Sequence, residues 1–341
     1  MGGSVEISPW SYNMAPNSVE TETVRDESPK SSDAVMDTKQ KSGTYFRGKI
    51  RWQTTIVLAA VHALAVYGLL TFPYLQSWKT LLWAYFVAMY TMIGINGGVH
   101  RLWCHKSFKA NVPLRMILAW FYLTAAQVSF KKWVQYHRCH HRYMETDADP
   151  HNSQRGFFFS HIGWLMIQKT PETRKRLKEV DLSDMEADPV IRFCDKYYVP
   201  LAIAVQVFSV LVPVYGWNES WKVAILSQTI RYAYTLNAMF SINSFAHMWG
   251  YKPYDKNIAP VENRWTSYVS FGEGWHNYHH TFPYDYRTPE IGGPRFDVVA
   301  WFIALFGMIG WAYDLKKPSP NLVQKTMNNK GDGTFMKAAV S

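Results

Sequence analysis

Residues 54–75 read TTIVLAAVHALAVYGLLTFPYL, an apolar run with a single histidine and no charged residue. A helix needs about 20 mostly apolar residues to cross a hydrocarbon core of roughly 30 Å. Residues 81–99 form a second apolar run, and residues 197–215 and 221–242 form a third and a fourth. A few residues separate the first run from the second, and GWNES separates the third from the fourth. The sequence therefore predicts four membrane-spanning helices in two hairpins.

The rest of the chain is more polar than these runs. Hydrophobic residues make up 48% of the 341 residues, yet charged residues make up 18% and the formal net charge is +10. Residues 1–44 have little to bury, so we expect a disordered cytosolic tail, and we expect a flexible tail over 316–341. Between the tails, residues 45–315 are predicted to form one membrane domain. Its two weaker apolar stretches, 114–128 and 298–312, predict helices at the membrane surface or packed on the soluble part.

The distribution of basic residues predicts an orientation. Those preceding the first span are Lys39, Lys41, Arg47, Lys49 and Arg51, whereas the hairpin turns carry only Lys79 and Lys222. Because cytosolic loops carry an excess of Lys and Arg, we expect both termini and residues 106–196 in the cytosol. The three cysteines predict no disulfide framework, which fits that reducing compartment.

Two polar residues fall inside the predicted spans. His62 is expected to be neutral and hydrogen-bonded within the protein. Arg231 is costly in lipid, so we expect it to face the protein interior or water.

Histidine is unevenly distributed. Of the 12 histidines, eight form the clusters HRLWCH (His100, His105), HRCHH (His137, His140, His141) and HNYHH (His276, His279, His280). One such cluster alone would indicate solvated histidines on a helix, but three clusters together indicate a metal site, because neutral imidazole is a common metal ligand. Eight imidazoles exceed what one ion accepts, so the sequence predicts two metal ions.

The spacing of the clusters predicts their placement. Residues at i, i+3 and i+4 share one face of a helix, so the second and third clusters each present three imidazoles in one general direction. His100 and His105 are five residues apart and diverge on an α-helix. They can bind one centre only if the helix ends or bends near Cys104.

The expected location of the site favours one chemistry over another. Zinc held by imidazoles could activate water for hydrolysis, whereas iron could bind and reduce O2. A site against the bilayer meets apolar chains, and an unactivated C–H bond requires a strong oxidant. Iron with O2 is therefore the favoured hypothesis, and zinc hydrolysis is the alternative.

Several longer motifs resemble one family. GVHRLWCHKSFKA, HRCHHRYMETDADPHN, RGFFFSHIGWL, NSFAHMWGYKPYDKNI and GEGWHNYHHTFPYDYR occur in this order. They are similar to motifs of the membrane fatty acyl-CoA desaturases, most closely the insect branch, and the resemblance covers about residues 45–315. It implies an all-α integral membrane protein of the endoplasmic reticulum, with four spans and a helical cytosolic cap that holds two iron ions.

The resemblance also implies ligands, co-substrates and partners. His247 would be a ninth histidine ligand, and Asn243 would contact a metal ion through water. The family reaction uses O2 and takes electrons from NADH through cytochrome b5 reductase and cytochrome b5. The substrate is a fatty acyl-CoA, and no nucleic acid is involved. The expected partners of the imidazole N–H groups are nearby carboxylates: Glu145, Asp147, Asp149, Glu273 and Asp285.

The chain departs from the family where the carrier of the acyl chain is held. Family members commonly read N-D-x-Y-E-W-x-R-D-H before the second cluster, whereas residues 128–137 read VSFKKWVQYH. Only Trp133 and the histidine remain, and Gln135 and Tyr136 replace an Arg-Asp pair. Further along the chain, Gln168 and Lys169 stand where family members have an Arg-Lys pair. The favoured interpretation is that CoA binds through Lys131, Lys132 and Lys169; the alternatives are another head group or weaker binding.

Four residues are candidates for the end of the acyl tunnel. Ala88 and Met92 precede the first cluster on the second span, and Phe240 and Phe245 flank Asn243. They predict an altered chain length or double-bond position, as in insect enzymes that make pheromone precursors; ordinary helix packing is the alternative.

Two other functions remain open at this stage. A membrane hydroxylase, acetylenase or conjugase would use the same metal chemistry on a lipid chain. A non-catalytic membrane metal-binding protein is the second alternative, although the histidines lie at helix ends and not along a pore.

Overall fold

The computed structural model describes residues 48–288 and 297–334, and these residues are mainly helical. The short strands β1 (Lys109–Ala110) and β2 (Ala312–Tyr313) pair antiparallel, with Lys109 opposite Tyr313. The predicted N-terminal tail, 1–44, lies outside the described residues.

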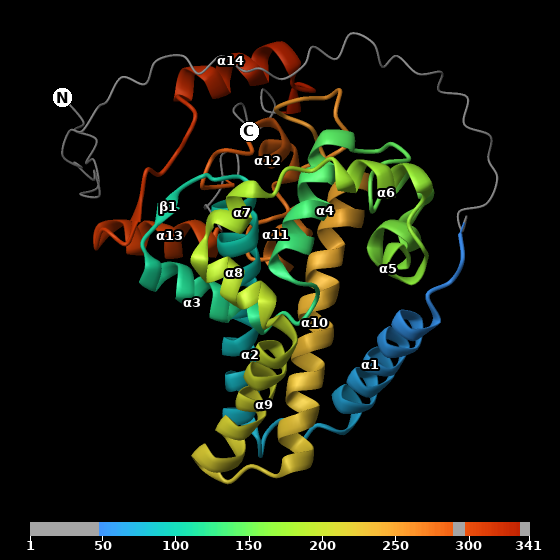
Figure 1. The fold of residues 1–341 in the computed structure, drawn as a ribbon, viewed down its shortest axis with the longest axis vertical. Helices are drawn as coiled ribbons and strands as arrows, with labels where there is room; N and C mark the ends of the chain where they lie inside the picture. Colours follow the sequence, from blue (N-terminus) through green and yellow to red (C-terminus); the bar gives the residue numbers. More distant parts are fainter. Residues whose placement is uncertain (1–47, 289–296, 335–341) are drawn as a thin grey trace, which may run out of the picture. The chain divides into compact units, whose positions relative to one another are not determined.

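Four long helical segments make up most of the lower part of the view in Figure 1, below most of the shorter helices. They are α1 (Trp52–Thr71), α2 (Trp78–Ile93) with the π-helix η1 (Gly94–Cys104), α9 (Tyr198–Trp217) and α10 (Trp221–Met248). The remaining helices are α3 (Val112–Leu123), α4 (Phe130–Tyr143), η2 (Ser153–Arg155), η3 (Phe159–Gly163), α5 (Trp164–Met166), α6 (Pro171–Lys178), α7 (Ser183–Ala187), α8 (Pro189–Lys196), α11 (Arg264–Val269), α12 (His276–Thr281), α13 (Val298–Met308) and α14 (Pro320–Lys330).

Within the described ranges, three helices are long and apolar enough to cross a membrane: Trp52–Thr71, Trp78–Cys104 and Tyr198–Trp217. The fourth predicted span corresponds to α10, which has 28 residues but a more polar composition. Helix α10 packs against α1, α2 and α9, so much of its surface faces protein and not lipid. Its crossing of the membrane therefore stays a prediction. Helices α3 and α13 are apolar but have only 12 and 11 residues, too few to span a bilayer.

The two polar residues of the predicted spans are bonded to the protein. Arg231 is 3% exposed and donates to the Thr124 carbonyl at 2.9 Å and to the Gln206 side chain at 2.6 Å. His62 Nδ1 donates to the Leu58 carbonyl at 2.8 Å, and Asn237 Nδ2 donates to His62 Nε2 at 3.0 Å. The predicted interior position of Arg231 and the predicted hydrogen bonding of His62 within the protein are confirmed.

The π-helix η1 explains how the first histidine pair is accommodated. The His105 N–H donates to the His100 carbonyl at 3.0 Å, an i to i+5 bond that belongs to a π-helix. Gly94, at the start of η1, lets α3 approach, because a Cβ there would lie 2.3 Å from the Tyr122 backbone nitrogen. The helix ends at Cys104, where the spacing of His100 and His105 required an end or a bend.

Part of the region expected to be a C-terminal tail forms a helix. Residues Pro320–Lys330 form helix α14, whose Met327 packs in a cluster with Tyr254, Tyr278 and Phe282. Because Tyr278 belongs to α12, this contact joins α14 to the helix that carries the third histidine cluster.

Candidate metal centre

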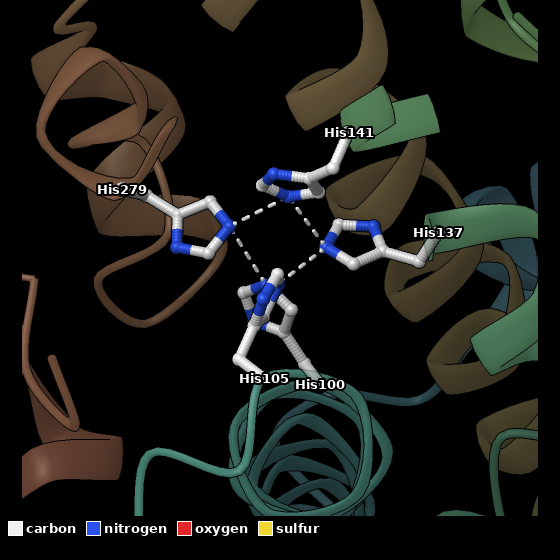
Figure 2. A group of neighbouring side chains, drawn as sticks. All are labelled: His100, His105, His137, His141 and His279. Carbon is white, nitrogen blue, oxygen red and sulfur yellow. Dashed lines mark hydrogen bonds between the residues drawn. The ribbon is translucent and has the colours of Figure 1, made fainter. Parts of the chain in front are cut away.

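The nine predicted histidine ligands lie in two groups. The five-histidine group consists of His100, His105, His137, His141 and His279 (Figure 2). The four-histidine group consists of His140, His247, His276 and His280. In each group the candidate ligand nitrogens all lie within 4.8 Å of one another.

Each three-histidine cluster contributes to both groups, a division that the spacing alone did not reveal. Consecutive residues on an α-helix point about 100° apart, so His140 and His141 diverge. On α4, His137 and His141 enter the five-histidine group and His140 enters the other. On α12, His279 enters the five-histidine group, while His276 and His280 enter the other.

The ring nitrogens are spaced as ligands of one ion would be. In the five-histidine group, neighbouring Nε2 atoms are 3.0 Å apart along the series His100, His279, His141, His137 and His105. Nitrogens about 2.1 Å from one ion lie about 3.0 Å apart at right angles and about 3.4 Å apart at tetrahedral angles. The spacing therefore favours a centre with more ligands than tetrahedral zinc accepts.

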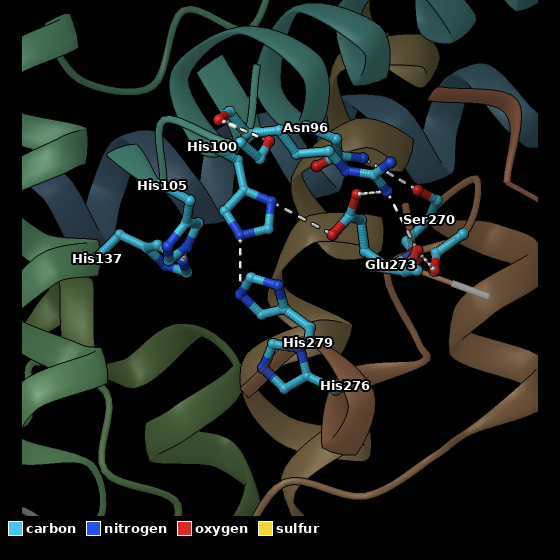
Figure 3. A network of polar contacts seen from close by, with 12 residues as sticks. Asn96, His100, His105, His137, Ser270, Glu273, His276 and His279 are labelled. Atoms are coloured by element: carbon cyan, nitrogen blue, oxygen red, sulfur yellow. Dashed lines mark hydrogen bonds and ion pairs between the residues drawn. The ribbon is translucent and has the colours of Figure 1, made fainter. Parts of the chain in front are cut away.

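Three carboxylates orient the imidazoles. Glu273 lies 3.3 Å from His100 Nδ1, Asp149 lies 3.0 Å from His140 Nδ1, and Glu145 lies 2.9 Å from His247 Nδ1. Each carboxylate accepts a hydrogen bond from Nδ1–H, which leaves the lone pair on Nε2, the nitrogen that is then free to bind a metal ion. Figure 3 shows this arrangement for His100 and Glu273.

Glu273 is held as an anion in the interior. Burial alone would raise its pKa, but the Arg101 guanidinium at 2.6 Å and the adjacent His100 lower the pKa to about 2. Arg101 is itself buried and also pairs with Asp297 at 3.0 Å. These contacts connect a histidine of the five-histidine group to a buried ion-pair network.

Four histidines of the site are neutral at physiological pH. Burial, followed by the proximity of other imidazoles, holds the pKa of His137, His141, His279 and His280 well below the ordinary histidine value. Neutral imidazoles offer lone pairs, and buried lone pairs that face one another are unfavourable without a cation between them. The residues present therefore fit two metal ions.

For the other two expected acidic residues, the hydrogen bonds found do not involve an imidazole of the two groups. Asp285 accepts a hydrogen bond from the Tyr278 hydroxyl at 2.6 Å, and the Asp147 main-chain carbonyl accepts one from Thr173 at 2.8 Å. His151, which we had not predicted, lies 4.2 Å from His140 between ring centroids. The signal for it was its position two residues after Asp149 in the motif DADPHN.

A cavity of about 430 Å³ adjoins the five-histidine group. Its wall includes His137, and α1, α10 and the segment before α4 contribute mainly apolar residues. Of the residues predicted to bind substrate, Trp133, Tyr136 and Phe240 line it, as does Asn243. Trp133 stacks on His137 with 4.9 Å between ring centroids, and both residues line the cavity, so it reaches one of the candidate metal ligands.

The remaining predicted substrate residues lie outside the lining of this cavity. Ala88 and Met92 are buried in the packed core, and the side chains of Phe245 and Gln168 are exposed. Gln135 Nε2 donates to the Leu177 carbonyl at 2.7 Å.

The predicted lysines differ in their surroundings. Lys131 Nζ lies 3.7 Å from Asp195 and 3.8 Å from Glu186, so its charge is paired. Lys132 and Lys169 lie 5.0 and 4.2 Å from the centre of the Tyr136 ring. Burial, with repulsion from Arg51 and Lys132, lowers the pKa of Lys169 to about 7.

The three cysteines are free and buried within the described ranges, and the histidine groups there include none of them. This agrees with a packing role for Cys104 and Cys139.

Comparison with known proteins identifies the family. A model of the fatty acid desaturase family matches residues 76–291, well over half of the chain. This chain belongs to the fatty acid desaturase family. An acyl-CoA Delta(11) desaturase of Spodoptera littoralis is 45% identical over 280 residues, which are 82% of this chain and 83% of that protein.

Related desaturases come from distant animals. An acyl-CoA Delta-9 desaturase of Acheta domesticus is 43% identical over 291 residues, 85% of this chain and 81% of that protein. A stearoyl-CoA desaturase 5 of Bos taurus is 43% identical over 290 residues, 84% of this chain and 86% of that protein. The predicted resemblance is confirmed, and this desaturase is an oxidoreductase.

Proposed function

We propose that this desaturase introduces a double bond into the acyl chain of a fatty acyl-CoA, with O2 as co-substrate and electrons from cytochrome b5. One observation carries the proposal: two groups of buried or half-buried histidines lie beside a mainly apolar cavity of about 430 Å³. The related proteins named acyl-CoA desaturases support the same reaction.

The nine histidines would hold two iron ions, and Asn243 would contact one of them through water. Bound iron would supply the O2 reduction and the oxidising power that an unactivated C–H bond requires. Glu145, Asp149 and Glu273 hold the imidazoles in the tautomer that exposes Nε2. The apolar wall of the cavity excludes water from the acyl chain, and no separate acid or base residue is assigned.

The carrier would be held by cations around Tyr136. Lys132 and Lys169 lie over this ring, and the exposed Arg51 lines the same cavity. A guanidinium binds phosphate bidentately, so Arg51 supports a CoA site that lacks the family's usual Arg-Asp pair. The paired charge of Lys131 makes its contribution smaller than that of Lys169.

We further propose four spans in the endoplasmic reticulum membrane, with both termini and the histidines in the cytosol. The basic residues before α1 and the scarcity of charge in the hairpin turns support this orientation. The formal net charge of +10 suits docking of an acidic heme protein such as cytochrome b5.

Expression in a yeast that lacks its own desaturase, followed by mass spectrometry of its fatty acids, tests the function. We expect an unsaturated product that requires O2, and none from His137→Ala. A hydroxylated, acetylenic or conjugated product would favour the alternative lipid enzymes. Bound iron without any O2-dependent product would favour the non-catalytic metal-binding protein.

The same experiment addresses the position of the double bond. Relatives of similar identity carry the names Delta(11), Delta-9 and Delta-12, so family membership does not decide it. The proposal that Ala88, Met92, Phe240 and Phe245 shape the tunnel end predicts a change of preferred chain length in Met92→Ala. An unchanged product profile would remove Met92 from the tunnel.

A further inference from the structure

A second, smaller cavity lies where the two histidine groups meet. Its volume is about 40 Å³. Histidines of both groups line it, namely His100 and His137 of the one and His140 and His276 of the other. The rest of the wall consists of Asn96, Trp133, Met239, Ile242, Asn243 and Glu273. The cavity is therefore shared by both groups. It is much smaller than the acyl-chain cavity and adjoins it, because Trp133, His137, Met239 and Asn243 line both.

Asn96 brings a polar atom without a protein partner to this wall. The residue is 1% exposed, and its Nδ2 donates to the Ser270 carbonyl at 3.1 Å. This bond orients the carboxamide and makes the other atom the oxygen. Within the described part of the chain, Asn96 Oδ1 has no hydrogen-bond partner. Buried carbonyl oxygens are usually satisfied by protein or by an ordered water.

Among the other groups in the wall, the Asn243 carboxamide carries N–H donors, and His276 Nδ1 is a second buried atom without a hydrogen-bond partner in the described residues. Met239 and Ile242 have no donor. The Nδ1–H of His100 is directed at Glu273, and the Nδ1–H of His140 is directed at Asp149. A water molecule needs a cavity of at least about 10–15 Å³ and two to four polar partners. The small cavity is larger than that minimum and presents two carboxamides.

We propose that this cavity holds one water molecule, which donates a hydrogen bond to Asn96 Oδ1 and also contacts the Asn243 carboxamide. Asn96 is then a positioning residue, because it determines where solvent lies between the two histidine groups. The consequence for catalysis rests on the proposed function. Bound iron would reduce O2 beside this water. If apolar atoms displaced the water, we expect part of the O2 to take only two electrons from the donor and two protons and to leave as hydrogen peroxide.

Two substitutions distinguish the effect of losing the hydrogen-bond acceptor from the effect of changing the side-chain volume. Asn96→Leu keeps the size of the side chain but removes the acceptor and fills the cavity with apolar atoms. Asn96→Ala also removes the acceptor, but it leaves space in which further water can enter. Ser267→Ala is the matched control, because Ser267 Oγ is another buried oxygen without a partner and lies outside this cavity.

The experiment uses the full-length, iron-loaded enzyme with its electron donors. We expect a water peak at hydrogen-bonding distance from Asn96 Oδ1 in a cryo-electron microscopy map of the unmodified enzyme. All three variants should retain the iron content of the unmodified protein. Peroxide formed per O2 consumed should rise several-fold in Asn96→Leu, less in Asn96→Ala, and not in Ser267→Ala.

Three results would overturn the inference. The first is a map without density in the cavity. The second is Asn96→Leu with unchanged peroxide release, and the third is loss of iron from both Asn96 variants, which would make Asn96 a structural residue. If the unmodified enzyme formed no unsaturated product, the proposed function would fail, while the map would still decide whether water occupies the cavity.

Discussion

At the scale of single residues, the site depends on the partners of the ring nitrogens. A histidine binds a metal through one nitrogen, and the hydrogen bond of the other nitrogen determines which one is available. Glu145 accepts from His247 Nδ1 at 2.9 Å and also from the Ser153 hydroxyl at 2.7 Å. Both of these bonds reach Oε1, and Oε2 accepts from the Gln154 N–H at 3.1 Å. The carboxylate is thus held through both oxygens, and its charge favours binding of a cation by His247.

We predict that Glu145→Gln weakens the metal centre. The amide keeps the shape of the side chain but loses the negative charge, and loss of such a partner typically costs 10–100-fold in metal affinity. Iron retained per chain during titration with a chelator measures the effect. Glu172→Gln, which alters a surface pair with Arg176, is the control and should retain iron normally. Equal iron retention in both variants would contradict the assigned role of Glu145.

From the lowered pKa of Lys169 we predict that substrate binding depends on pH. Its pKa is lowered to about 7, so the ammonium is charged below that pH and becomes neutral above it. If it binds a phosphate of CoA, the KM for acyl-CoA should rise as the pH increases through about 7. In Lys169→Arg, which stays charged, the KM should depend less on pH. Lys131→Arg is the control, because that lysine is already paired with Asp195 and keeps its charge in the variant.

At the scale of elements, the π-helix η1 decides how the second span meets the metal site. Because of its i to i+5 hydrogen bonds, the side chains of His100 and His105 point into the same five-histidine group although they are five residues apart. The close approach of α3 to Gly94 holds this region in place. An ordinary α-helix continued through Cys104 would direct the two imidazoles apart.

We predict that Gly94→Ala disrupts this packing. The added Cβ would lie 2.3 Å from the Tyr122 nitrogen and 2.4 Å from the Phe121 carbonyl carbon, both in the backbone of α3. Overpacking of this kind typically costs about 1–3 kcal/mol, and thermal unfolding in detergent measures it. Gly216→Ala in α9 is the matched control, because nothing lies within 4 Å of the added Cβ. That variant should be neutral or slightly more stable, since alanine favours helix.

At the scale of the whole molecule, the helix α10 links the parts that function requires. It packs against α1, α2 and α9, it contributes Asn243 and Phe240 to the large cavity, and it carries His247. Its 28 residues correspond to about 42 Å, more than a hydrocarbon core of roughly 30 Å. Because protein surrounds much of it, it can combine this length with polar side chains.

The proposed topology can be tested by labelling single introduced cysteines in sealed microsomes. Lys222→Cys, exposed in the first turn of α10, should react with a membrane-impermeant maleimide only after the membrane is opened. Lys178→Cys, exposed in α6, should react in sealed vesicles. The same response at both positions would contradict four spans with a cytosolic histidine site.

The amino-acid sequence by itself determined the features that depend on local composition and spacing. Apolar length predicted the long helices, because crossing a bilayer requires about 20 residues whatever the fold. The density of histidines predicted metal binding, and the motifs predicted the family. The tertiary structure alone decided how the imidazoles are divided, because His137 and His140 share a helix face but meet different partners from α10, α12 and η1. It also decided that Asn96 faces both groups, because burial and missing hydrogen bonds depend on segments far apart in the chain.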